Sequence, residues 1–168
     1  MTLARTLCSL AMTGVAAGCA QPALLADDLE GKPWETQRTL LPPPPKTGAK
    51  LLPFYVGPTD FSYFVDPASV SVGPDRVVRY TLIARSDSGA TNVSYEGIRC
   101  ESFERRVYAL GRSDGTWSQA RYSQWTRINR LAVEPQAALA DDFFCRMNGG
   151  AVRTTEDALD VLARGNRR

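Results

Sequence analysis

The fold is decided between Phe61 and Arg127, where residues 61–117 read FSYFVDPASVSVGPDRVVRYTLIARSDSGATNVSYEGIRCESFERRVYALGRSDGTW and residues 123–127 read SQWTR. Extended apolar and β-branched runs fill this stretch, and they are separated by Gly73-Pro74-Asp75, Ser86 to Ala90 and Gly111 to Gly115. Runs of this length bounded by turn residues are typical of antiparallel strands joined by short loops. The stretch therefore predicts a β-meander, in which each strand pairs with the next.

Six strands are expected, at residues 51–56, 61–65, 77–85, 91–99, 103–110 and 116–122, with Trp125 and Ile128 closing the sheet. Pro53 lacks a backbone donor, so the first strand should lie at an edge. Asp66-Pro67 is expected to turn the chain after the second strand. In the third strand Val78, Tyr80 and Leu82 should share one face, because side chains alternate along a strand.

Two helices are expected after the sheet. Apolar side chains recur at spacings of four within residues 136–147, which is the spacing of one helix face. A second, short helix should begin at Thr154, where Asp157 completes a capping pattern, and end at Gly165. The sequence thus predicts the α+β class: an antiparallel β-meander sheet with a C-terminal helix packed on one face and one further short C-terminal helix.

Residues 1–18 are expected to be a signal peptide. Arg5 supplies positive charge, and the uncharged run that follows is shorter than the roughly 20 residues that a spanning helix needs. The run ends in Val15-Ala16-Ala17-Gly18-Cys19, which resembles the lipobox of bacterial lipoproteins. The resemblance implies lipidation of Cys19, which anchors the chain to a membrane, and Ala20 after it permits transfer to an outer membrane. The alternative is cleavage after Ala20 and a soluble periplasmic protein.

Residues 19–49 are expected to form an acidic, proline-rich linker. Pro42 to Pro45 is a run of four prolines, which favours an extended polyproline II rod. We expect this rod to be a stalk that lifts the folded domain off the membrane; the alternative is a ligand for a proline-reading domain. The folded domain is then expected over residues 50–150, with a helical tail over 151–168.

The cysteines separate into two pairs. Cys8 and Cys19 belong to the export signal, whereas Cys100 and Cys145 lie in the body of the chain. Two remaining cysteines in an exported chain favour a disulfide. We therefore expect Cys100 and Cys145 to join the sheet to the first helix; the alternatives are two free buried thiols or bridges between chains.

No constellation of catalytic residues is visible in the sequence. The chain has no histidine, so the commonest general base and the commonest metal ligand are both absent. No Gly-x-Ser-x-Gly elbow marks a serine nucleophile. Asp141 and Asp142 are adjacent, and on a helix they would point in different directions. We expect no catalytic residue, no cofactor and no metal site.

The charged residues do not indicate a binding surface. A net charge of +2 does not favour a nucleic-acid partner. The densest charge cluster should form cross-strand ion pairs on the exposed face of the sheet, and Arg79 and Arg85 should be exposed as well. The members of this cluster are Glu96, Arg99, Glu101, Glu104, Arg105 and Arg106.

Several blocks of the sequence resemble the CNP-like family, which is named after a cryptic neisserial protein. They are YFVDPASVSVG (63–73), VVRYTLIARSDSGATNVSYEGIRCES (77–102), ERRVYALG (104–111), DGTW (114–117) and DDFFC (141–145). The resemblance covers roughly Trp34 to Met147 and implies a small exported protein of no known activity. A looser resemblance is to the surface-adhesin protein E family, which implies an antiparallel sheet with a packed helix and a named member that binds host matrix proteins. No adhesion residue of that family maps onto this chain.

The function expected from these observations is that of a non-enzymatic cell-envelope lipoprotein of bacteria. It would be a binding or assembly module with an unknown envelope or extracellular partner, placed in the outer membrane and facing the periplasm or the surface. The alternatives are a surface adhesin for host or matrix proteins and an enzyme of unknown reaction.

Overall fold

The computed structural model describes residues 39–46, 48–146 and 150–165, all within one unit of the chain, Pro33–Arg168. The expected signal peptide, its lipobox and Cys19 lie outside the described residues, and so does Met147. None of the helices in these described ranges has the length and apolar character needed to span a bilayer.

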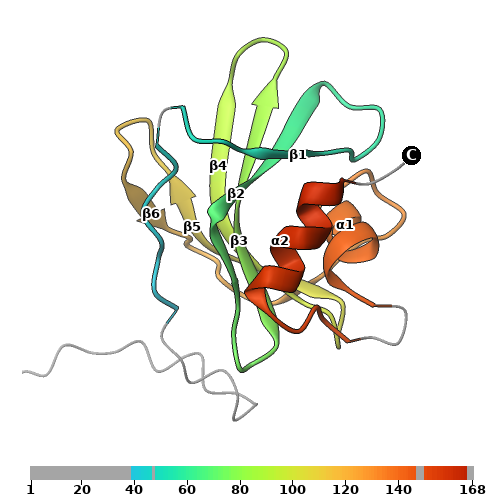
Figure 1. Cartoon of the computed structure of the whole chain (residues 1–168). Coiled ribbons are helices and arrows are strands. Elements are labelled where there is room, and N and C mark those ends of the chain that lie inside the picture. The colour runs from blue at the N-terminus through green and yellow to red at the C-terminus, as the bar shows by residue number, and fades with distance from the viewer. Residues whose placement is uncertain (1–38, 47, 147–149, 166–168) are drawn as a thin grey trace, which may run out of the picture. The chain divides into compact units, whose positions relative to one another are not determined.

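The β-meander is confirmed (Figure 1). Six antiparallel strands follow one another in space in their chain order, and β7 pairs with β5 beyond this path. Their bounds are β1 Leu52–Phe54, β2 Phe61–Val72, β3 Val77–Ser86, β4 Thr91–Arg99, β5 Glu104–Gly111, β6 Trp117–Gln119 and β7 Thr126–Arg127. The expected turn residues separate β2 from β3, β3 from β4 and β5 from β6, and Pro53 lies in the edge strand β1.

The expected turn at Asp66-Pro67 was wrong, because β2 continues through these residues with a shift in its register against β3. The side chains of Asp66 and Ser69 supply hydrogen bonds where the backbone ladder between β2 and β3 is interrupted. Asp66 Oδ1 accepts from the backbone N–H of Ala68 at 3.1 Å, and Ser69 Oγ donates to the Asp66 carbonyl at 2.7 Å. Ser69 Oγ also accepts from the N–H of Thr81 on β3 at 2.7 Å. The Asp-Pro-Ala-Ser block therefore builds a β-bulge, which is a position where a strand tolerates proline.

The first expected helix is shorter than its apolar spacing suggested. The α-helical part, α1, is Pro135–Leu139, and a π-helical turn, η2, follows at Ala140–Phe144. Cys145 already has extended backbone geometry and forms an isolated bridge with Ala151, so the helix ends before residue 147. The wider π turn brings Phe143, Phe144 and Cys145 to the sheet in succession.

The second helix, α2, is Thr155–Arg164, and both of its expected ends are confirmed. The Thr154 side chain accepts from the Asp157 N–H at 3.0 Å, and Asp157 accepts in return from the Arg153 N–H at 3.3 Å. Gly165 ends the helix with φ of 70°, a conformation that glycine adopts without strain.

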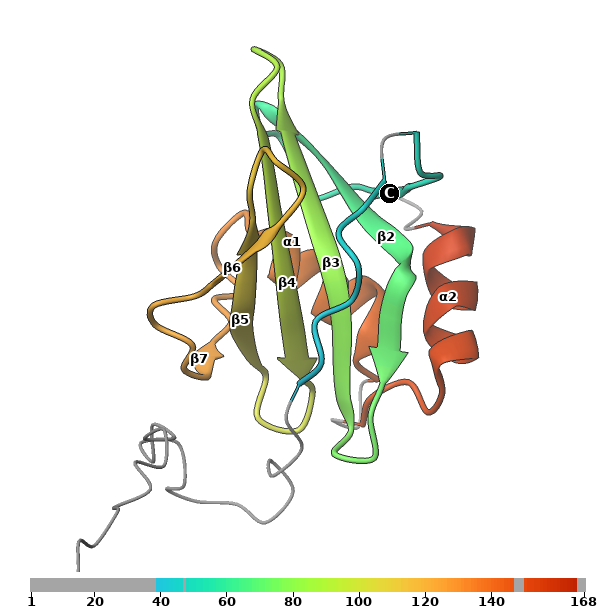
Figure 2. The same cartoon turned by 90° about the vertical axis from the view of Figure 1, so that its left-hand side faces the viewer.

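The main core lies between the sheet and the helices, which cover the same face (Figures 1 and 2). As expected, Val78, Tyr80 and Leu82 of β3 all point into it. The largest fully buried side chains in the core are Tyr80, Phe144, Ile98, Leu139, Val65 and Val78.

The second face of the sheet is covered as well, which the sequence pattern does not predict. Figure 2 shows the blue segment that precedes β1 crossing in front of β3 and β4, on the side opposite α1. Val77, Thr81 and Ile83 point to this side of β3 and are 0%, 0% and 2% exposed. The central strand is therefore buried on both faces. We call residues Thr39–Lys46 the strap and this side of the sheet the strap face.

Candidate functional site

An aromatic cluster lies on the strap face. Tyr95 of β4 is 3% exposed, and its ring centroid lies 5.7 Å from that of Tyr108 and 6.3 Å from that of Trp117. Tyr95 pairs with Thr81 of β3, which points to the strap face, and with Ala109 of β5. Paired residues point to the same side of a sheet, so Tyr95 lies on the side opposite the helices. These residues form a second, smaller apolar cluster, separate from the main core.

The strap is joined to this cluster by a hydrogen bond. Trp117 Nε1 donates to the carbonyl oxygen of Pro42 at 2.7 Å, across a separation of 75 residues in the chain. Pro42, which was expected to belong to the stalk, is therefore held against the sheet. The role of residues 19–49 as a linker stays a prediction, since most of them lie outside the described residues.

Gly97 makes room for Tyr108 on the strap face. In the ladder Gly97 lies between Arg79 of β3 and Arg106 of β5, and a Cβ atom added to it would lie 2.8 Å from Tyr108 Oη. Two guanidinium groups lie over the Tyr108 ring, with Arg79 Cζ 5.8 Å and Arg106 Cζ 5.5 Å from its centroid. Both distances are within the range of cation–π attraction.

Arg79 is buried and paired, contrary to the expectation of an exposed charge. Its side chain is 11% exposed and that of Asp75 is 3% exposed, and Nη1 donates to Asp75 Oδ1 at 3.1 Å while Nη2 donates to Oδ2. Burial alone would raise the pKa of Asp75, but the hydrogen bond and charge of Arg79 hold that pKa below its ordinary value. Burial alone would lower the pKa of Arg79, and Asp75 and Tyr108 raise it instead. The bidentate pair is therefore charged and structural.

Arg99 is also buried, at 8% exposure, whereas an exposed position was expected. The expected cross-strand ion pair is present. Arg99 faces Glu104 in the ladder, and Arg99 Nη1 lies 3.4 Å from Glu104 Oε2. Its guanidinium stacks on Trp125 with Cζ 4.0 Å from the ring centroid. The aromatic cover explains how the sheet accommodates a second arginine away from water.

Glu96 lies on the helix side of the sheet and not on an exposed face. It is 3% exposed, and its two carboxylate oxygens are held by side chains from two strands and from α1. Gln136 Nε2 donates at 2.8 Å, Tyr80 Oη at 3.3 Å and Ser94 Oγ at 2.6 Å. Burial and the neighbouring carboxylate raise the pKa of Tyr80 well above its ordinary value. Glu96 thus ties α1 to the sheet, and its oxygens are enclosed by protein donors.

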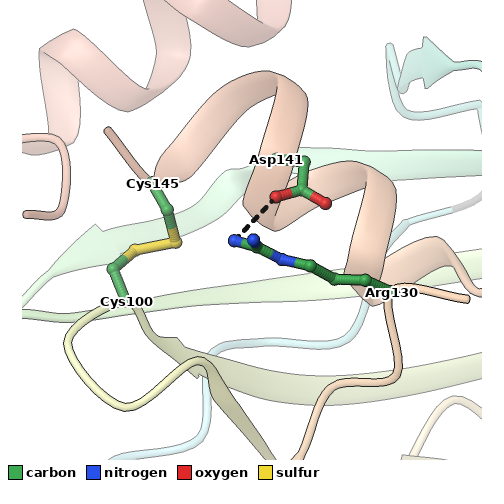
Figure 3. The surroundings of a disulfide bond; sticks show 4 residues. All are labelled: Cys100, Arg130, Asp141 and Cys145. Atoms are coloured by element: carbon green, nitrogen blue, oxygen red, sulfur yellow. Dashed lines mark ion pairs between the residues drawn. A yellow bond between two sulfur atoms is a disulfide. The ribbon is translucent and has the colours of Figure 1, made fainter. Parts of the chain in front are cut away.

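The expected disulfide is confirmed. Cys100 and Cys145 are joined, with their Cα atoms 5.3 Å apart, and the bond links the end of β4 to the end of η2 (Figure 3). Beside it, Arg130 Nη2 pairs with Asp141 Oδ1 at 3.1 Å. Asp141 therefore has a cationic partner, and no group of three or more metal-ligating side chains is found in the described ranges of the chain.

An open groove of about 600 Å³ lies near the disulfide, where the β4–β5 turn meets β7. Phe103 contributes to it with φ of 54°, an uncommon conformation for an aromatic residue, and Arg130 Cζ lies 3.8 Å from the centre of its ring. The groove is lined by Glu101, Ser102, Phe103, Arg127, Ile128, Asn129 and Arg130. Its two arginines are both exposed, and Arg130 is already paired with Asp141.

Comparisons with known proteins add one match. No curated protein and no solved structure matches this chain significantly. The model of the CNP1-like family matches residues 29–163. This range contains the whole described sheet, α1, η2, all of α2 except Arg164, the disulfide and the strap face. The chain therefore belongs to the CNP1-like family.

Proposed function

We propose that this protein is an exported lipoprotein of the bacterial cell envelope whose folded domain is a non-enzymatic binding or assembly module. The observation that carries the proposal is the Cys100–Cys145 disulfide. Such bonds form and persist in oxidising compartments, including the bacterial periplasm, and are rare in a reducing cytosol. The lipobox-like ending at Cys19 supports a lipid anchor in the same compartment.

The binding role rests on how the polar residues are used. Glu96 is enclosed by three donors, Arg79 is held by Asp75, and Arg99 is held between Glu104 and Trp125. A general acid or base needs a titratable atom within hydrogen-bond reach of substrate. The strongest candidates for that task are instead engaged in holding the fold, which favours a binding module over an enzyme.

In-cell photocrosslinking tests this proposal. A photoreactive residue placed at Leu131, which is 97% exposed, or at Tyr122, which is 89% exposed, samples two separate surface loops. A binding module predicts a discrete adduct with another envelope component from one position. If neither these positions nor a scan of the other exposed residues yields an adduct, the binding role is wrong.

Protease treatment of cells distinguishes the two orientations. A module that faces the periplasm should resist protease added to intact cells and be degraded once the outer membrane is permeabilised. Degradation in intact cells would favour the surface adhesin instead.

A further inference from the structure

The strap has the chemistry of a polyproline II ligand. Each of its four prolines fixes its own φ near −65°, and each also biases the residue before it toward extended geometry. A polyproline II helix repeats every three residues, so Pro42 and Pro45 share one side. Both are half-buried, as is Pro44, whereas Pro43 is exposed. Three of the four prolines are therefore partly covered, and one lies in water.

The strap face has the features of a surface that recognises a polyproline II segment. Proline-recognition surfaces pack aromatic rings against the rod and donate hydrogen bonds to its carbonyls, which have no partners within the rod. Here Tyr95, Tyr108 and Trp117 supply the rings, and the Trp117 indole donates to Pro42 at 2.7 Å. Two further polar atoms of this face, Arg79 Nε and Thr81 Oγ1, are buried without a hydrogen-bond partner in the described part of the chain.

The strap lies on this face without pairing as a strand of the sheet. Residues 39–46 belong to no strand, so no ladder of backbone hydrogen bonds holds them. Leu40 is 82% exposed and Leu41 is 40% exposed, so the strap presents its prolines to the sheet and leaves its leucines in water. Gly48, just after the strap, has φ of 79° and open space around it. The strap can therefore leave the face without breaking a strand.

We propose that the Tyr95–Tyr108–Trp117 face is a binding site for proline-rich, polyproline II segments of a partner polypeptide, and that the strap of this chain is its resident ligand. The inference deepens the proposed binding role and rests on it. The partner is a chain that presents prolines three residues apart to these rings and a carbonyl to the Trp117 indole. Release of the strap is then the step that opens the site.

Binding of a synthetic peptide with the strap sequence, TLLPPPPK, tests the proposal on the full chain. A variant with Pro42→Ser, Pro44→Ser and Pro45→Ser keeps the length of the strap but removes its three half-buried proline rings. The indole N–H signal of Trp117, assigned by its loss in Trp117→Phe, should move in this variant and return toward its wild-type position as peptide is added. The Trp125 signal, from a ring stacked under Arg99, is the internal control and should stay in place.

The peptide should bind the strap variant at least about tenfold more tightly than wild type, because a tethered ligand competes at roughly millimolar effective concentration. The same peptide with alanine at its four prolines should not bind, and Trp117→Phe in the strap variant should weaken binding by about tenfold. If the triple variant does not fold, a spin-labelled strap peptide added to wild type at several millimolar must broaden the Trp117 signal, and the alanine peptide with the same label must not.

Three results would overturn the proposal: a strap that stays docked in the triple variant, no peptide binding to the opened face, or equal binding by the alanine peptide. None of them bears on export, lipidation or the in-cell adduct, so failure of this site is distinguishable from failure of the proposed function.

Discussion

Arg79 is the residue whose role the structure changes most. Replacing it by alanine should lower the free energy of unfolding by about 3–5 kcal/mol, because Asp75 is left as a buried carboxylate without its cation. Arg85 is the matched control on the same strand. It is exposed and only covers Phe64, with Cζ 4.9 Å from the ring centroid, so Arg85→Ala should change stability by less than about 1 kcal/mol. Urea unfolding of both variants measures the difference, and equal losses would contradict the buried pair.

The same pair predicts how stability depends on pH. The pKa of Asp75 is lower in the folded chain than its ordinary value of 3.8, so the unfolded chain binds the proton more tightly. The stabilisation is complete above the unfolded pKa and is lost as the pH falls through the folded pKa. Asp75→Asn should therefore reduce stability at pH 7 and flatten the decline of stability below about pH 5. Unfolding curves between pH 7 and pH 2 check this, and an unchanged acid slope in the variant would argue against it.

At the residue scale, the sequence predicted which face of the sheet a side chain points to better than it predicted whether that side chain is buried. Alternation along β3 correctly placed Val78, Tyr80 and Leu82 together, with Arg79 on the opposite face. Alternation cannot show whether a face is covered, because the cover here is a segment without periodicity. A hint was available in Gly97, since a glycine inside a strand often marks a close approach, here by Tyr108.

At the scale of elements, the disulfide should be the largest single constraint. It closes a loop between residues 45 apart in sequence, for which chain entropy gives roughly 4 kcal/mol of stabilisation. The double variant Cys100→Ser and Cys145→Ser should lose stability on that scale, and a reductant should destabilise wild type to the same extent. A reductant should leave the double variant unchanged, which is the control. Wild type and double variant unfolding at the same urea concentration would contradict the assignment.

Elements joined by turn residues were predicted well, and irregular elements were not. Gly73-Pro74-Asp75 and Ser86 to Ala90 set the ends of β3 through local backbone preferences. The bulge after Asp66 depends on Ser69 reaching the N–H of Thr81 on another strand. The π turn at η2 likewise depends on where Cys145 meets Cys100. Both irregularities arise from contacts distant in sequence, which propensities do not contain.

At the scale of the whole molecule, counting cysteines was sufficient to find the bridge, because only Cys100 and Cys145 remained once Cys8 and Cys19 were assigned to the expected export signal. The strap face could not be predicted in the same way. Its rings come from β4, β5 and β6, and its occupant comes from a proline run interpreted as part of a linker. The run itself was visible in the sequence, and so was the possibility that it is a ligand; what was missing was the surface that binds it.

The central claim, an exported lipoprotein with a disulfide-closed domain, is tested most directly by the chemical state of Cys19 in protein taken from bacterial membranes. Mass spectrometry of the N-terminal peptide should show a chain that begins at Cys19 and carries a diacylglycerol on its thiol. Cys19→Ala should lose the fatty-acid label and leave the membrane fraction, while its Cys100–Cys145 bond still forms. An unmodified Cys19, a chain that begins after Ala20, or equal fatty-acid incorporation by wild type and Cys19→Ala would contradict the account.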